Sequence, residues 1–221
     1  MASKKRVYQI AIDGPGGAGK STIAQEVAKR LGFLFINTGG MYRCYAIALK
    51  NTDISNLEQI KQVLYNNHVT FTPERLYLNG TDVTKECYTA SISMLASKIG
   101  TIAAVREKCV KDQQKIAEGQ SCVMEGRDTT TVVLPNATLK IFLTASIDTR
   151  ANRRWLQNNK REPLEIIKKD LIARDYQDSH RSIAPLKKAI DAIEISTDNK
   201  TFEENVQQVI QAFKLKEALS V

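Results

Sequence analysis

The sequence predicts an α/β fold in which helices cover both faces of a five-stranded parallel sheet. Three observations support this prediction. First, five short apolar runs typical of buried strands alternate with helical segments along the 221 residues. Second, a glycine-rich turn follows the first run and leads directly into a helix. Third, glycines and polar residues gather where the second run and a later run end, and ligands bind at that edge of open parallel sheets.

The first apolar run, residues 7–12, leads into the segment G-P-G-G-A-G-K-S-T. This segment matches G-x-x-x-x-G-K-S, with the strand before it and the helix after it that the motif requires. Glycines let backbone N–H groups turn inward around a phosphate chain, and the helix start adds its positive dipole end. Lys20 would reach the β- and γ-phosphates, and the Ser21 hydroxyl would ligate Mg²⁺. The expected phosphate-binding residues are Gly14, Pro15, Gly16, Gly17, Ala18, Gly19, Lys20, Ser21 and Thr22.

The elements of the first half follow from periodicity and stop signals. The helix after the glycine-rich turn carries Ile23 and Val27 on one face and ends at Gly32, a residue that favours helix ends. Short apolar runs indicate buried parallel strands, and alternating apolar residues indicate antiparallel ones. The sequence therefore predicts a strand at 33–36, helices at 40–49 and 57–66 (the second after the cap-like Asp53 and Ser55), and antiparallel strands at 68–71 and 76–78.

The second half continues the same alternation. A long helical region is expected first, and a buried strand after it delivers Glu125, Gly126, Arg127 and Asp128 at its end. Ser146 and Asp148 are typical caps of a further helix. The expected elements are helices at 89–117, 162–179 and 202–219, a helix after Ser146, and strands at 121–124, 139–143 and 192–195.

Composition bounds the function. Hydrophobic residues at 43% and charged residues at 25% are ordinary for a globular protein. The net charge of +8 fits nucleotide phosphates, nucleic acid or simply a solvated basic surface. Only 6% of residues are aromatic, which disfavours recognition of single strands by base stacking. The cysteines lie far apart and are expected to be reduced thiols, and no apolar run suggests export or membrane insertion.

Several arginines are candidates for contacting phosphates. Arg43 and Arg127 follow glycines just beyond predicted strand ends, on the same edge of the sheet as Lys20. Their planar forked donors suit bidentate phosphate capture, whereas a single surface arginine would be the unremarkable alternative. Arg150, Arg153 and Arg154 lie together on one helix, which suits either a lid over the transferring phosphoryl group or a solvated charged face.

Five segments in this order resemble the bacterial cytidylate kinases: I-A-I-D-G-P-G-G-A-G-K-S-T from Ile10, N-T-G-G-M-Y-R from Asn37, E-G-R-D from Glu125, K-I-F-L-T-A-S from Lys140 and R-D-Y-Q-D-S-H-R-S-I-A-P-L from Arg174. The resemblance covers nearly the whole chain. It implies transfer of the γ-phosphoryl group of ATP to CMP or dCMP, with Mg²⁺, giving ADP and CDP or dCDP. The dispersed cysteines and the lack of a sustained heptad or apolar stripe fit a cytoplasmic monomer without specific nucleic-acid or membrane partners.

The resemblance also implies roles for individual residues. Lys20, Arg43 and Arg127 would be catalytic, with the last two holding phosphates. Cytosine offers a 4-amino donor for a carboxylate and N3 and O2 acceptors for a guanidinium, which suits Asp128 and Arg106. The chain departs from the family pattern at Asn37 and Glu125, where Asp is usual. The expected CMP-binding residues are Thr38, Tyr42, Arg43, Ser97, Arg106, Arg127, Asp128, Arg174, Asp178 and Arg181.

The expected organisation is one domain over residues 1–221 with three kinds of region. They are a core (1–36, 118–149 and 182–221), a monophosphate-binding region (37–117, with the insertion near 67–98) and a lid with its following helix (150–181). Two other functions remain open at this point. The acceptor could be another small molecule, as in sugar or shikimate kinases, or the chain could bind nucleic acid with ATP as a switch. Acceptor-dependent thermal stabilisation and salt-dependent RNA or DNA binding discriminate among the three.

Overall fold

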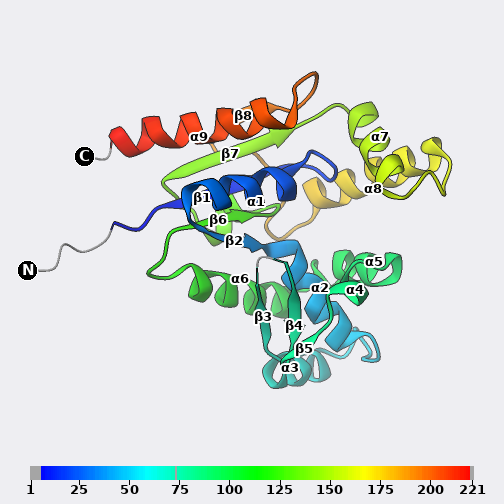
Figure 1. Cartoon of the computed structure of the whole chain (residues 1–221). Helices are drawn as coiled ribbons and strands as arrows, with labels where there is room; N and C mark the ends of the chain where they lie inside the picture. The colour runs from blue at the N-terminus through cyan, green and yellow to red at the C-terminus, as the bar shows by residue number, and fades with distance from the viewer. Residues whose placement is uncertain (1–5, 73, 220–221) are drawn as a thin grey trace, which may run out of the picture. The chain divides into compact units, whose positions relative to one another are not determined.

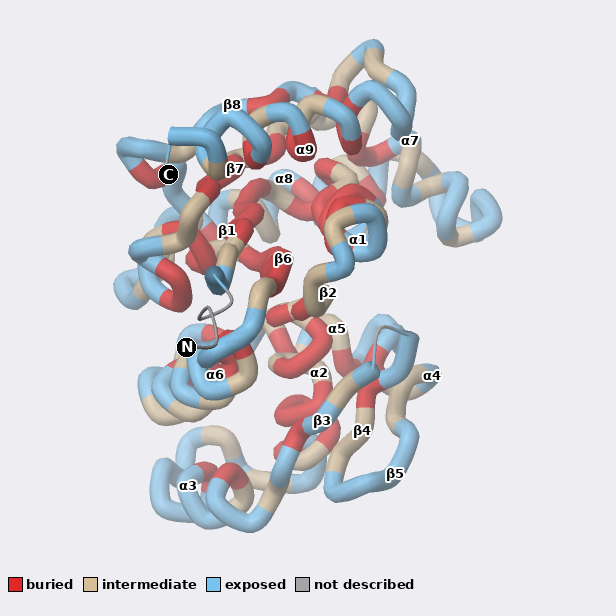
Figure 2. The backbone as a smooth tube through the Cα atoms, turned by 60° about the vertical axis from the view of Figure 1, so that its left-hand side comes forward, coloured by how far each residue is buried: buried red, intermediate tan, exposed pale blue. Residues whose placement is uncertain are grey.

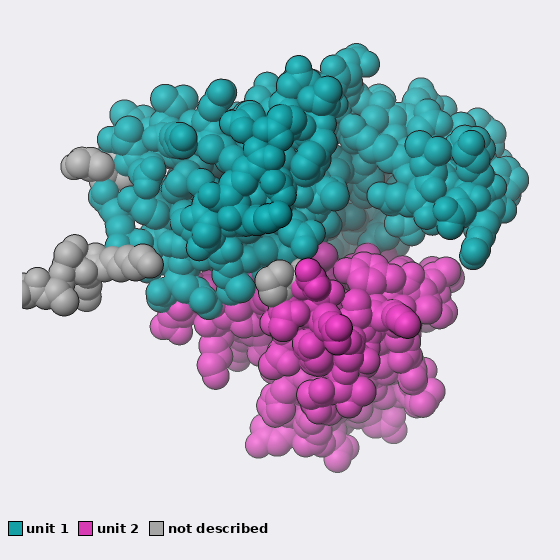
Figure 3. Space-filling view, viewed as in Figure 1, with its two compact units in different colours: residues 1–35, 119–221 teal, residues 36–118 magenta. Residues whose placement is uncertain are grey.

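The computed structural model describes residues 6–72 and 74–219. The chain forms two compact units, which Figure 3 distinguishes by colour. Unit 1 consists of residues 1–35 and 119–221, and unit 2 consists of residues 36–118. Figure 1 traces the elements of both units along the chain.

A five-stranded parallel sheet confirms the predicted fold class. Its strand order is β2-β6-β1-β7-β8. The central strand β1 pairs in parallel with both neighbours, so that Ile10 lies opposite Val123 on one side and Leu139 on the other. A strand with a partner on each edge has all its ladder groups satisfied, and β1 is accordingly buried (Figure 2). The strands are β1 (Gln9–Asp13), β2 (Leu34–Asn37), β6 (Cys122–Glu125), β7 (Leu139–Thr144) and β8 (Ile193–Ser196).

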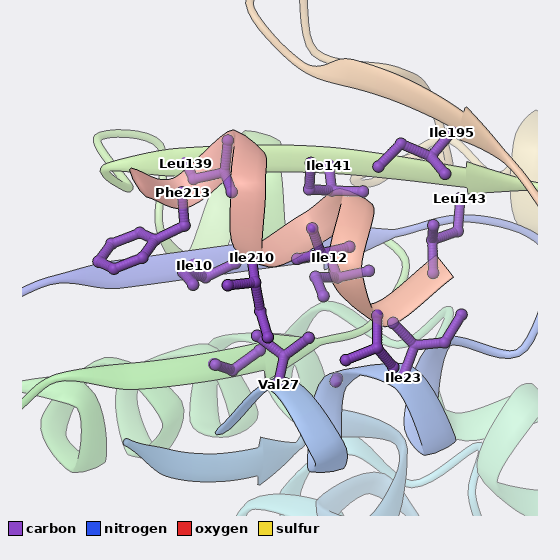
Figure 4. Close-up of a cluster of buried hydrophobic side chains, with 14 of the residues drawn as sticks. Ile10, Ile12, Ile23, Val27, Leu139, Ile141, Leu143, Ile195, Ile210 and Phe213 are labelled. Atoms are coloured by element: carbon purple, nitrogen blue, oxygen red, sulfur yellow. The ribbon is translucent and has the colours of Figure 1, made fainter. Parts of the chain in front are cut away.

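The main core of unit 1 lies between the sheet and two helices (Figure 4). Ile12 and Ile141 from the strands meet Ile23 and Val27 of α1 (Lys20–Leu31) and Phe213 of α9 (Phe202–Ala218). Each such side chain stabilises the fold by about 1.5–3 kcal/mol through burial. Both helices begin and end within two residues of the bounds that the sequence predicts. The remaining helices of unit 1 are α7 (Ile147–Gln157), α8 (Leu164–His180) and a short π-helical turn, η1 (Thr129–Val133).

Unit 2 combines helices with a small antiparallel sheet. Its strands run in the order β3-β4-β5, and Val69 pairs with Leu78, which confirms the predicted antiparallel insertion. The third strand was not predicted. The elements are α2 (Thr38–Leu49), α3 (Leu57–Asn66), β3 (Val69–Phe71), β4 (Leu76–Leu78), β5 (Thr81–Asp82), α4 (Thr84–Cys87), α5 (Ala90–Ile99) and α6 (Ala103–Ala117).

The predicted long helix over 89–117 is wrong, because two helices, α5 and α6, occupy that range. The chain leaves the helical conformation at Ile102, whose φ of −85° and ψ of 123° are extended. The buried side chain of Arg106 donates from Nη1 to the carbonyl oxygen of Gly100 at 3.1 Å, which compensates that carbonyl for the lost helical bond. The apolar periodicity continues across the break, although Gly100, the C-cap of α5, is a stop signal in the sequence.

One smaller difference concerns the start of a helix. Asn56 caps α3 by accepting a hydrogen bond from the backbone N–H of Gln59, whereas Asp53 and Ser55 bond to each other. Ser146 caps α7 as predicted, by accepting from the N–H of Thr149. Among the described residues, no helix is both long enough and apolar enough to cross a membrane.

Candidate active site

The glycine-rich loop between β1 and α1 depends on backbone shapes that only glycine adopts easily. Gly14 has a φ of +148°, and a Cβ added there would lie 2.1 Å from the carbonyl oxygen of Leu143. Gly17 has a φ of +80°, and its Cβ would lie 3.0 Å from the Cβ of Arg150. The loop is therefore pressed against β7 and α7, which leaves no room for side chains at these positions.

Lys20 begins α1, and its side chain folds back over the loop. The side chain is buried, and Nζ donates to the carbonyl oxygen of Pro15 at 2.8 Å. Burial, and after it the charge of Arg127, lowers the pKa of Lys20 to about 7, while Glu125 and Asp13 oppose that shift. Anionic phosphate oxygens at this place would restore the charged form and take up the bond now made to Pro15.

Ser21 and Glu125 bring two oxygen atoms together beside Lys20. The Ser21 hydroxyl donates to Oε1 of Glu125 at 2.8 Å, and Glu125 is buried at the end of β6. A hydroxyl and a carboxylate are hard ligands of the kind that suit Mg²⁺, which usually completes its shell with phosphate oxygens and water. Among the described residues no group of three or more His, Cys, Asp or Glu could hold a metal alone. The pair therefore fits a metal that arrives with a nucleotide.

Beyond Glu125, two consecutive residues form ion pairs with α8 and the residue that follows it. Nε of Arg127 donates to Oδ2 of Asp178 at 2.8 Å, and Oδ1 of Asp128 lies 3.5 Å from Nη2 of Arg181. A Cβ added to Gly16 would lie 3.5 Å from Nη2 of Arg127, so this guanidinium lies directly over the glycine-rich loop. Unit 1 therefore brings Lys20, Arg127 and Asp128 to one edge of its sheet.

The arginines of α7 lie in three different environments. Arg150 is buried and donates from Nη1 to the carbonyl oxygen of Gly16 at 3.1 Å and to Asp175 at 2.5 Å. Arg153 donates to the hydroxyl and the carbonyl of Thr197, both at 2.9 Å. Arg154 is exposed. Arg150 and Arg153 thus support the glycine-rich loop and the residues around it. Of the three, only Arg154 is exposed to solvent on the helix surface.

In unit 2, the expected substrate residues lie on α2, α5 and α6. Asn37 caps α2 by accepting from the N–H of Gly40 at 2.8 Å, so this departure from the family pattern keeps a helix-capping side chain. Thr38 is buried in the first turn of α2, and Ser97 is half-buried on α5.

The two candidate site arginines of unit 2, Arg43 and Arg106, lie over aromatic rings. The guanidinium carbon of Arg43 is 5.3 Å from the ring centre of Tyr88, and that of Arg106 is 5.7 Å from the ring centre of Tyr42. Such contacts hold a planar cation by attraction to the ring face and leave its edge donors able to bind other groups. Arg106 also bonds to Gly100, as described above.

The family model for cytidylate kinase matches residues 10–215, which is nearly the whole chain. The chain belongs to the cytidylate kinase family. The Cytidylate kinase of Alkaliphilus oremlandii (strain OhILAs) is 46% identical over 211 residues, covering 93% of this chain and 97% of that protein. The Cytidylate kinase of Thermotoga maritima is 41% identical over 210 residues, covering 92% and 96%.

A solved structure outside the cytidylate kinases shares the architecture. A gluconokinase from Sinorhizobium meliloti 1021 superposes with a TM-score of 0.52 at 14% identity, covering 97% of this chain and 98% of its own. A likeness at this level of identity shows the fold alone. It does not favour a sugar acceptor over a nucleotide for this family member.

Three residues that support the expected site were not singled out from the sequence. Tyr88 lies under Arg43, and Asp175 pairs with Arg150. Asp13 binds Thr129 and Thr130, the segment that follows Arg127 and Asp128. The motif around Gly14 includes Asp13, but the pattern gives no sign of its partners.

Proposed function

We propose that the chain transfers the γ-phosphoryl group of ATP to CMP or dCMP, giving ADP and CDP or dCDP. The observation that carries this proposal is the position of Arg127 over the glycine-rich loop, beside the buried Lys20. Phosphoryl transfer between two nucleotides gathers several negative charges in one place and therefore needs cations beyond the loop itself. Membership of the cytidylate kinase family supports CMP as the acceptor.

The chain's contribution to the transfer is binding and charge stabilisation, without a covalent intermediate. Backbone N–H groups of the loop would hold the β-phosphate, and Lys20 and Arg127 would stabilise the charge on the phosphoryl group in transit. Mg²⁺ bound to the nucleotide would add further positive charge, with the hydroxyl of Ser21 and the carboxylate of Glu125 as the residues that hold it. The hydrogen bond from Nε of Arg127 to Asp178 orients the guanidinium before substrate arrives.

The residues expected from the family resemblance to bind CMP are Thr38, Tyr42, Arg43, Ser97, Arg106, Arg127, Asp128, Arg174, Asp178 and Arg181. Arg43 and Arg127 would bind the phosphate. Asp128 would accept from the 4-amino group of cytosine, and Arg106 would donate to N3 and O2.

Uracil tests this assignment because it carries a carbonyl at position 4 and an N–H at position 3. Its binding would leave a buried carboxylate facing a carbonyl oxygen, at a cost of about 1–3 kcal/mol. A coupled assay of ADP release with CMP, dCMP, UMP and AMP measures the preference. We expect CMP or dCMP to exceed UMP by about tenfold or more in kcat/KM. Faster turnover of UMP or AMP by tenfold would overturn the acceptor assignment.

We also propose that the enzyme acts as a cytoplasmic monomer on small-molecule substrates, without a specific nucleic-acid partner. Light scattering of the purified chain tests whether it is a monomer. Binding of RNA or DNA at physiological salt tests the last, because sequence-independent electrostatic binding falls steeply as salt rises. Submicromolar affinity for RNA at physiological salt would contradict the proposal.

A further inference from the structure

Asp13, the last residue of β1, is a buried carboxylate that the proposed transfer does not use. Its side chain is fully buried. Burial raises the pKa of Asp13, while hydrogen bonds from Thr130 and Thr129 oppose that rise. A buried carboxylate is costly to the fold unless donors surround it, so the identity of its donors indicates what it does.

All three hydrogen bonds that Asp13 accepts come from two consecutive residues. The N–H of Thr129 donates to Oδ1 at 2.9 Å, and the N–H and hydroxyl of Thr130 donate to Oδ2 at 2.7 and 2.6 Å. Thr130 lies 117 residues from Asp13 along the chain. These two N–H groups open η1, a turn that no side chain of its own caps. Asp13 therefore caps this turn from another strand.

The short segment before Thr129 is consequently attached to β1 at both ends. At its start, the N–H of Gly126 donates to the carbonyl oxygen of Ile12 at 2.9 Å. At its end, Thr129 and Thr130 bind Asp13. Only Arg127 and Asp128 lie between the two attachments, and their side chains form the ion pairs with Asp178 and Arg181.

We infer that Asp13 is a positioning residue for the acceptor nucleotide, which acts by fixing the backbone that presents Arg127 and Asp128. The same strand end continues into Gly14, so one residue ties the loop for the donor phosphates to the segment for the acceptor. An asparagine in place of Asp13 would turn its N–H₂ group toward the N–H or O–H donors of Thr129 and Thr130. The hydrogen bonds that attach this segment to β1 would then weaken. The inference rests on the proposed roles of Arg127 and Asp128 in binding CMP.

Thr130→Val is the variant that tests the inference, because it removes one donor to Asp13 and leaves the glycine-rich loop unchanged. Thr130→Ser restores the hydroxyl. Thr131→Val is the matched control, since the Thr131 hydroxyl lies 3.4 Å from the carbonyl oxygen of Asp128 and makes no bond to Asp13. The full-length chain with MgATP is assayed while CMP and ATP are varied separately.

We expect Thr130→Val to raise KM for CMP about tenfold and to change KM for ATP less than about twofold, as for loss of one bond to a charged group. Thr130→Ser and Thr131→Val should stay within about twofold of the parent in both constants. Asp13→Asn should raise KM for CMP further, because an amide cannot accept all of these hydrogen bonds. Equal changes in both KM values, or lower thermal stability with KM for CMP unchanged, would overturn the inference and leave Asp13 a purely structural residue.

Amide hydrogen exchange keeps the test independent of the proposed function and of variants that fold poorly. In the parent chain, the N–H groups of Thr129 and Thr130 should exchange slowly, and in Thr130→Val the N–H of Thr129 should exchange at least about tenfold faster. Unprotected amides in the parent would refute the attachment itself. If CMP is not a substrate but these amides are protected and respond to Thr130→Val, the proposed function fails and the positioning role in CMP binding fails with it. If CMP is a substrate and its KM does not move, only the inference fails.

Discussion

The two units hold their candidate residues in different ways. In unit 1, the contacts join segments far apart in the chain: Arg127 and Asp178 are 51 residues apart, and Arg150 and Gly16 are 134 apart. In unit 2, the hydrogen bond of Arg106 reaches Gly100 only 6 residues away, and its long-range contact is with the ring of Tyr42. A parallel sheet brings distant strand ends to one edge, so the residues of unit 1 are fixed only when the whole unit folds.

The kind of contact differs as well. Arg127 and Arg150 donate to carboxylates and carbonyl oxygens, which fixes the direction of their guanidinium groups. In unit 2, Arg43 and Arg106 also lie over the rings of Tyr88 and Tyr42, and a ring face, unlike a hydrogen-bond acceptor, imposes no donor direction. We therefore expect unit 1 to provide a rigid frame for the transferring group and unit 2 to adapt to the acceptor. Substitutions in unit 1 should then lower kcat, and those in unit 2 should mainly raise KM for CMP.

The largest effect is expected for Lys20→Met. Removing the ammonium takes away charge stabilisation of the transferring phosphoryl group, and kcat should fall by about 10²–10³-fold or more. Steady-state kinetics with saturating ATP and CMP measure it. Lys29→Met, at an exposed position near the end of the same helix, is the control and should keep kcat within about twofold. A rise in KM with kcat unchanged would show that Lys20 only binds nucleotide, contrary to the expected role of unit 1.

A pair of conservative substitutions compares the units directly. Arg127→Lys loses the forked donor and leaves the mostly buried Asp178 without the Nε–H bond, so kcat/KM for CMP should fall by about 10–100-fold, mainly in kcat. Arg43→Lys should cost about tenfold, mainly in KM for CMP, because a point charge still neutralises phosphate. Equal effects on kcat for the two variants would contradict the expectation that unit 1 is a rigid frame and that unit 2 adapts to the acceptor.

The sequence predicts the parts of unit 1 that a local motif determines. The start of α1 at Lys20 follows from the glycine-rich turn, and its end follows from Gly32, whose φ of +67° is left-handed. The place of Arg127 at a strand end also follows from the pattern, because strand ends in a parallel sheet share an edge.

What the sequence does not reveal is set by tertiary contacts. Gly100 is a stop signal at the end of α5, but the bond from Arg106 that stabilises the break between α5 and α6 has no signal in the sequence. Asp13 finds its donors 117 residues away, and no spacing rule connects it with Thr130. The residues next to Arg150 in the sequence would suit an exposed lid arginine as well. In the structure, however, Arg150 is buried against the loop. Partners of this kind become visible only when the fold is known.

Tyr88 tests whether the aromatic contact of unit 2 contributes to acceptor binding. Tyr88→Ala removes the ring beneath Arg43, and KM for CMP should rise about two- to fivefold, which corresponds to a cation–π contribution of about 0.5–1 kcal/mol. Tyr88→Phe keeps the ring and should behave like the parent. Because Tyr88 is largely exposed, neither change should lower thermal stability appreciably. If Tyr88→Phe is as impaired as Tyr88→Ala, the hydroxyl rather than the ring face matters.

The smallest effect concerns an exposed ion pair of unit 1 that also joins distant residues. Arg30 donates to both oxygens of Glu203 at 2.7 Å, across 173 residues of sequence, whereas Glu107 and Lys111 in unit 2 are one helical turn apart. The Arg30 hydrogen bond lowers the pKa of Glu203 from 4.5 to about 2. The folded chain thus binds this proton less tightly than the unfolded chain, so the pair stabilises the fold above pH 4.5 and ceases to do so as the pH falls toward 2.

Glu203→Gln should therefore lower the melting temperature by about 1–2 °C at pH 7 and low ionic strength, and the difference from the parent should shrink as the pH approaches 2 or as salt is added. Glu107→Gln is the matched control, because it breaks the local ion pair with Lys111. It should change the melting temperature by about 1 °C or less, as is usual for pairs one helical turn apart. Thermal unfolding followed by circular dichroism at several pH values measures both. If the two variants lost the same amount of melting temperature, and salt did not change that loss, sequence separation and bidentate geometry would add nothing to the stability of a surface ion pair. The long-range contacts of unit 1 would then owe their strength to burial alone, because burial is what Arg127 and Arg150 have and Arg30 lacks.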